Sequence, residues 1–153
     1  MNGISKAINQ KKFTSIYHKG IISIFYIANL IKGQNNHLFK SRSITIQQYN
    51  LLRILRGSSP NPCSIGILKE RMMDKMSDAS RLVDRLVILG LAERIENSVD
   101  RRAVDVHITQ KGMNILSDLD KHQKEFEKAL TCLSTKELDT LMTLLDKVID
   151  ASL

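Results

Sequence analysis

Apolar residues recur at helical spacing over much of the chain. Between Ile21 and Ile31 they occupy positions i, i+3, i+4, i+7 and i+10, and this spacing predicts one long helix over residues 4–34. Hydroxyl residues precede the other apolar periods, and they predict helices that begin after Thr45, Ser64, Ser77, Thr109 and Ser134. The chain is therefore expected to be mainly helical.

Two short segments depart from the helical period. Residues 91–95 and 103–108 alternate between apolar and polar side chains, as half-buried strands do. The sequence NSVDRR lies between them and is typical of a polar hairpin tip. We predict a mainly α protein with a small β wing.

Composition sets the size of the core and the distribution of charge. The 153 residues suit one domain, and 42% hydrophobic residues without Trp predict a core of aliphatic side chains. The net charge is +7, but residues 1–44 carry seven Lys or Arg and no acidic residue, whereas residues 113–153 are net acidic. This asymmetry indicates either a polyanionic partner contacted from one side or a solvated basic surface that binds nothing.

Several classes of protein are disfavoured. Cys63 and Cys132 match neither a disulfide framework nor a metal motif, and the four histidines are scattered. We find no phosphate loop, nucleophile motif or apolar carboxylate pair, so we expect no enzyme, cofactor or metal. The apolar run 21–31 is too short to cross a membrane and starts too late for a usual signal peptide. A cytoplasmic protein without a membrane partner is expected.

The order of the predicted elements is that of a winged helix-turn-helix. In this fold a polar-faced helix can enter the major groove of double-stranded DNA. The helix from Ser77 to Gly90 offers side chains for that contact, namely Ser77, Asp78, Ser80, Arg81, Asp84 and Arg85. The hairpin tip offers Asp100, Arg101 and Arg102, and a narrow minor groove favours an inserted arginine. The alternative for the tip is a solvated turn with a weak ion pair.

At these motifs the chain resembles the multiple-antibiotic-resistance regulator (MarR) family. The matching pieces are SRLVDRL (80–86), LGL (89–91), DRR (100–102) and ITQKG (108–112). The resemblance implies a homodimeric transcription factor, usually a repressor, that binds a near-palindromic operator. It implies dimerisation helices in residues 1–44 and 113–153 and a DNA-binding domain in residues 45–112. It also makes Arg102 the minor-groove arginine, with Asp100 and Arg101 supporting it.

The resemblance further implies a small aromatic or anionic effector that releases the DNA. Candidate lining residues are Phe25, Tyr26, Asn29, Tyr49 and Arg53. Two alternatives stay open at this point. One is a winged-helix module that binds an acidic protein, and the other is a constitutive DNA-binding protein without a ligand.

Overall fold

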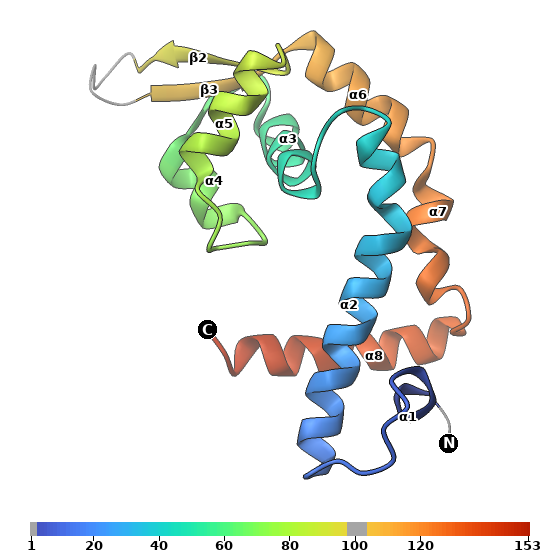
Figure 1. Ribbon diagram of the computed structural model, residues 1–153. Helices are drawn as coiled ribbons and strands as arrows, with labels where there is room; N and C mark the ends of the chain where they lie inside the picture. The colour runs from blue at the N-terminus through green and yellow to red at the C-terminus, as the bar shows by residue number, and fades with distance from the viewer. Residues whose placement is uncertain (1–2, 98–103) are drawn as a thin grey trace. The chain divides into compact units, whose positions relative to one another are not determined.

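The computed structural model describes residues 3–97 and 104–153. The chain divides into two compact units, Met1–Lys121 and His122–Leu153. The first unit holds helices α1 to α6 and a small sheet, and Figure 1 shows α3, α4 and α5 gathered beside strands β2 and β3. The mainly helical fold with a β wing that the sequence predicted is confirmed.

The single N-terminal helix predicted over residues 4–34 is wrong, because the helix is interrupted at residues 8–15 and then continues to Lys40. The structure has a short helix α1, Ile4–Ala7, and a separate long helix α2, Ile16–Lys40. Between them Asn9 has a positive φ of 51°, which breaks the helical backbone. Ser15 then caps α2, because its side chain accepts a hydrogen bond from the backbone N–H of His18 at 3.1 Å.

At its C-terminal end, α2 continues through the polar run QNN at residues 34–36, where the predicted helix ended. Asn35, Leu38 and Phe39 are buried, so packing holds this segment in the helix. The Phe39 ring packs against Tyr49, with ring centroids 5.0 Å apart. Tertiary contacts therefore override the polar sequence signal, as they often do.

The next four helices begin close to their predicted caps. They are α3 at Ile46–Ser58, α4 at Ile65–Arg71, α5 at Ala79–Ile88 and α6 at Gln110–Asp120. The capping box of α3 is complete, because the Gln48 side chain accepts from the Thr45 N–H at 2.8 Å and Thr45 accepts from the Gln48 N–H at 3.2 Å. Their inward faces form one aliphatic core, whose fully buried members include Leu51, Leu52, Leu68, Val83, Leu86, Val106, Leu116 and Leu119.

The sheet has one strand more than the sequence predicted. Strands β1 (Cys63–Ser64), β2 (Ala92–Glu96) and β3 (Val104–Ile108) pair antiparallel in the order β1-β3-β2. Two residues are too few to show an alternating pattern, so β1 carries no sequence signal of its own. The wing strands β2 and β3 pair from Ala92 opposite Ile108 to Glu96 opposite Val104.

A compact junction joins the turn after α5 to the start of α6. Gly90 has a φ of +69° and ends α5 as predicted. The Thr109 hydroxyl donates to the Gly90 carbonyl at 2.8 Å and also accepts from the Gly112 N–H at 3.2 Å. The Lys111 ammonium donates to the Leu89 carbonyl at 2.8 Å. The LGL and ITQKG motifs therefore contact each other, and this contact fixes the position of the wing relative to α5.

Two ion pairs fasten the last turn of α6 to the rest of the first unit. Arg42 Nε donates to Asp118 Oδ2 at 2.9 Å, and the same guanidinium donates to the Leu38 carbonyl at the end of α2. Arg56 of α3 pairs with Asp120 at 2.6 Å. The hydrogen bonds from Arg42 lower the pKa of the Asp118 carboxyl below its ordinary 3.8, and the hydrogen bond to Asp120 raises the pKa of Arg56.

Asp118→Asn is expected to change how stability depends on pH. Because the folded-state pKa of Asp118 is lowered, its pairing stabilises the fold above the usual carboxyl pKa, and that stabilisation is lost as pH falls through the folded-state value. Urea unfolding from neutral pH down to about pH 2 measures this effect. The free energy of unfolding of wild type should exceed that of the variant at neutral pH and equal it at the acid end. Asp146→Asn, on the exposed surface of the last helix, is the control and should track wild type. A constant gap at every pH would contradict the assignment.

The second unit contains α7 (Gln123–Glu127), the 3₁₀ helix η1 (Lys128–Leu130) and α8 (Thr135–Asp150). Apolar residues recur at helical spacing from Ile115 to Leu130 and predict one continuous helix after Thr109, which is wrong because α6 ends at Asp120. Leu119 is the last buried residue of α6, so no buried side chain continues the helix beyond it. The predicted capping box at Ser134 is confirmed. No helix among the described residues is long and apolar enough to cross a membrane.

Candidate nucleic-acid interface

Helix α5 has one buried face and one polar face. Ala79, Val83 and Leu86 are buried, and their spacing of three and four residues places them on one side. The opposite side is exposed and carries the predicted candidates Ser80, Arg81, Asp84 and Arg85. The core therefore holds α5 firmly while its hydrogen-bonding side chains face outward.

The N-terminus of α5 differs from the prediction by one residue. Asp78, not Ser77, is the N-cap, and its Oδ1 accepts a hydrogen bond from the Arg81 N–H at 3.2 Å. Ser77 instead donates its hydroxyl to Asp74 Oδ2 at 2.7 Å within the preceding turn. Because the carboxylate of Asp78 satisfies a free helix N–H, its first role is structural.

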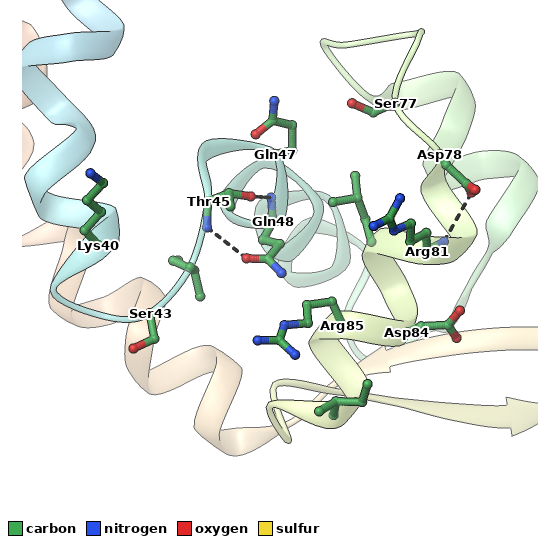
Figure 2. Close-up of a pocket in the computed structure, with 13 residues that line it drawn as sticks. Lys40, Ser43, Thr45, Gln47, Gln48, Ser77, Asp78, Arg81, Asp84 and Arg85 are labelled. Carbon is green, nitrogen blue, oxygen red and sulfur yellow. Dashed lines mark hydrogen bonds between the residues drawn. The ribbon is translucent and has the colours of Figure 1, made fainter.

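A groove runs between α5 and the N-terminus of α3. This open groove has a volume of about 800 Å³, and its walls include the cationic side chains Lys40, Arg81 and Arg85 and the carboxylates of Asp78 and Asp84. Figure 2 shows Arg81 and Arg85 extending from α5 toward the α3 end, and Asp84 of the same helix also lines the groove. Ser43, Thr45 and Gln47 add polar groups from the α2–α3 connection. The three cations outnumber the two carboxylates, and together with the hydroxyls and a helix N-terminus they favour an anion such as a phosphate.

Sequence reasoning did not include Lys40, Ser43 and Gln47 in this face. Lys40 and Ser43 belong to the end of α2 and the loop after it, which the sequence separated from α5 by more than thirty residues. The capping box at Thr45 was the available signal, because it predicts that a helix N-terminus with free N–H groups lies there.

Arg94 of β2 is a further residue that sequence reasoning missed. Its Nη2 lies 2.7 Å from Asp84 Oδ1 and donates to Ser80 Oγ at 3.3 Å. Two of the predicted nucleic-acid contacts therefore already have a partner within the protein. Nothing in the run AERIE distinguishes this arginine from any other exposed residue of a strand.

The predicted tip residues Asp100, Arg101 and Arg102 lie outside the described residues. The strands that flank them are described, and a polar contact links these strands at the end next to the tip. Asn97 Nδ2 donates to Asp105 Oδ2 at 2.8 Å, and Asp105 is buried. A buried carboxylate needs such a partner, so this contact holds the two strands together where they lead into the tip.

The structure brings together two of the five effector candidates. The Arg53 guanidinium lies 5.9 Å from the centroid of the Tyr49 ring on α3. Phe25, Tyr26 and Asn29 lie on the exposed surface of α2, and they do not line the groove beside α5. Among the described residues, no group of three or more His, Cys, Asp or Glu could hold a metal ion.

Comparison with known proteins identifies related chains. Residues 37–125 match the family model of the ArnR1-like winged-helix domain. The chain is 32% identical over 117 residues to the HTH-type transcriptional regulator MgrA of Staphylococcus aureus, covering 76% of this chain and 78% of the relative. It is 28% identical to a crystal structure of a MarR transcription factor from Planctomyces limnophilus, with a TM-score of 0.66 over 88% of this chain and 98% of the other.

A third similar structure contains nucleic acid. The C80S mutant of E. coli MarR, complexed with operator DNA, is 25% identical, with a TM-score of 0.73 over 96% of this chain and 99% of that one. The relatives are named as transcriptional regulators. This agrees with the prediction that the chain is not an enzyme.

Proposed function

Because this chain belongs to the MarR family of winged helix-turn-helix transcriptional regulators, we propose that it is a homodimeric repressor of a near-palindromic DNA operator. The observation that carries this proposal is the exposed polar face of α5, held outward by the buried Ala79, Val83 and Leu86. In this proposal residues 45–112 form the DNA-binding domain, to which Lys40 adds a contact, while residues 1–44 and 113–153 form the dimer.

Helix α5 enters the major groove. Ser80, Arg81 and Arg85 project from the exposed face, where hydroxyl and guanidinium groups can reach base edges and phosphates. Lys40 and the N-terminus of α3 contribute from across the groove beside α5, which receives the sugar–phosphate backbone. Asp78 caps the helix and sets the position of its first turn on the DNA.

The wing tip reaches the adjacent minor groove. Arg102 inserts there, and Asp100 and Arg101 support it, because the negative potential of a narrow minor groove attracts a guanidinium. The hydrogen bond between Asn97 and Asp105, at the tip end of the described strands, supports this role, since it fixes the strands that present the tip.

Exposed apolar faces on α2 and α8 support the dimer. On α2, Ile21, Ile24, Phe25 and Ile27 are at least half exposed, and on α8 so are Leu144, Val148 and Ile149. Such a concentration of exposed large apolar side chains marks a surface that associates with another protein. A second copy of the chain covers both faces, and two-fold symmetry then places two α5 helices on half-sites about one DNA turn apart.

A small aromatic or anionic effector releases the DNA. The contact between Arg53 and Tyr49 supports this part, since a guanidinium over an aromatic ring offers both charge and an apolar surface. Phe25, Tyr26 and Asn29 complete the site in the dimer. The ligand acts only if it prefers a spacing of the two α5 helices that does not match the operator.

Selection of DNA from a random duplex library by the purified protein tests the function. The selected duplex and a scrambled version are then compared by fluorescence anisotropy across a salt series. A repressor of this kind binds the selected duplex more tightly than the scrambled one, and its affinity falls steeply with salt. Equal and weak binding to both would reject the proposal and favour a winged-helix module that binds an acidic protein.

Arg102→Ala is expected to weaken binding of the selected duplex by roughly 1–3 kcal/mol, because a minor-groove contact is lost. The measurement is an anisotropy titration at one fixed salt concentration. Lys136→Ala removes one positive charge from α8 and serves as the matched control, which should bind like wild type. An equal loss of affinity in both variants would show that only net charge matters. No loss of affinity in either variant would contradict a contact between the wing and the DNA.

A further inference from the structure

We propose that Arg94 is a positioning residue that locks α5 to the wing through Asp84 and Ser80, so that both reach the DNA in one fixed arrangement. This inference rests on the proposed DNA-binding function and deepens it. Arg94 and Asp84 act together as a neutral pair, and neither is a direct DNA contact.

The geometry couples α5 to β2 beyond the turn that joins them. Ser80 and Asp84 are four residues apart and therefore lie on the same side of α5, one turn from each other. Arg94 reaches both, at 3.3 Å from Ser80 Oγ and 2.7 Å from Asp84 Oδ1. The Arg94 backbone is itself fixed, because β2 pairs it with Val106 of β3, which is fully buried. The guanidinium thus connects the sheet to the middle of α5.

The charge of Asp84 gives this contact a role on DNA. Its carboxylate is about half exposed on a helix that otherwise presents Arg81 and Arg85. A lone carboxylate there would repel phosphates, since charges within about 8 Å interact at physiological salt. Arg94 neutralises it and leaves the net positive charge of the face unchanged.

The lock matters more in the complex than in the free protein. In water, a pair exposed to this extent contributes little to stability. When DNA covers α5 and the wing, water leaves the interface and the attraction between the same two charges becomes stronger. We therefore expect the pair to affect recognition of the operator while leaving the melting temperature almost unchanged.

A direct contact between Arg94 and a phosphate makes the opposite prediction for Asp84. In that case Asp84→Asn would strengthen binding to any DNA, because it frees the arginine and removes a negative charge. Arg94→Gln would weaken binding to all sequences equally and reduce the salt slope by about one. Two results therefore distinguish the lock from a direct phosphate contact. One is whether Asp84→Asn strengthens or weakens binding, and the other is whether the ratio of affinities for the selected and scrambled duplexes changes.

The test uses wild type, Asp84→Asn, Arg94→Gln and the double variant. Anisotropy with the selected and scrambled duplexes gives the ratio of the two affinities for each protein. We expect the ratio to fall about fivefold in each single variant, and no further in the double variant, because both changes break the same lock. An unchanged ratio in either single variant, additive losses, or a drop in melting temperature that accounts for the loss would overturn the proposal.

A second readout does not depend on DNA. The small contribution of the exposed pair falls on the local opening of β2, so hydrogen exchange of the β2 amides in the free protein should be up to about fivefold faster in both single variants, and equally fast in the double variant, while the melting temperature is unchanged. If wild type itself failed to prefer the selected duplex, the proposed function would be rejected. Hydrogen exchange alone would then test whether Arg94 locks α5 to the wing. Exchange at the wild-type rate in either single variant would then overturn it.

Discussion

Gly112→Ala is expected to lower the free energy of unfolding by about 3 kcal/mol, because the new methyl group has no space. A Cβ at this position would lie 2.3 Å from the carbonyl oxygen of Leu91 and 2.8 Å from Cγ1 of Ile108. The Leu91 carbonyl cannot move aside freely, since it accepts a hydrogen bond from the Thr109 N–H at 3.1 Å. Relief of the clash would have to separate α6 from the turn after α5.

Gly57→Ala is the matched control for this prediction. Gly57 also lies in a helix, but its nearest neighbour would be the end of a flexible side chain, Arg71, at 3.8 Å. Alanine there should stabilise the protein by about 0.5–1 kcal/mol through helix propensity. Urea unfolding of both variants measures the two effects. Equal stability of Gly112→Ala and wild type would show that α6 does not pack as closely as the structure indicates.

The junction around Gly112 also shows what could be predicted from the sequence. The LGL turn and the ITQKG motif were each recognised, as were the left-handed Gly90 and the cap at Thr109. These are local features, and local chemistry was enough to predict them. That the two motifs touch, with Thr109 on the Gly90 carbonyl, is a tertiary fact. The sequence therefore predicted both halves of the junction without predicting the junction.

Two of the errors have the same cause. The continuation of α2 through Asn35 and the end of α6 at Asp120 both depend on which side chains the core buries, whereas the break before Ser15 is local, at Asn9 with its positive φ. In the candidate interface, the polar face of α5 followed from its period. Lys40 and Arg94 did not, because each comes to α5 from another element. Patterns within one element were readable, whereas contacts between elements were not.

Val148→Asp is expected to abolish the proposed dimer and with it the high affinity for the operator. Val148 lies on the apolar side of α8 with 58% of its surface exposed. In a dimer this position would be covered, and a buried unpaired carboxylate is costly. A monomer holds one half-site only, so the affinity for the full operator should fall on the order of 100-fold, as expected when two linked binding events become one.

Sedimentation velocity and anisotropy on the same samples measure both effects. Thr143→Asp adds the same charge to the same helix at an exposed polar position, and it should remain dimeric with wild-type affinity. The affinity of Val148→Asp should also stop depending on whether the duplex carries one half-site or two, because a monomer cannot use the second. A variant that stays dimeric and still gains from the second half-site would exclude the apolar face of α8 from the interface. If the wild-type protein sediments as a monomer, the proposed dimer is contradicted, and the exposed apolar faces of α2 and α8 would then bind another partner.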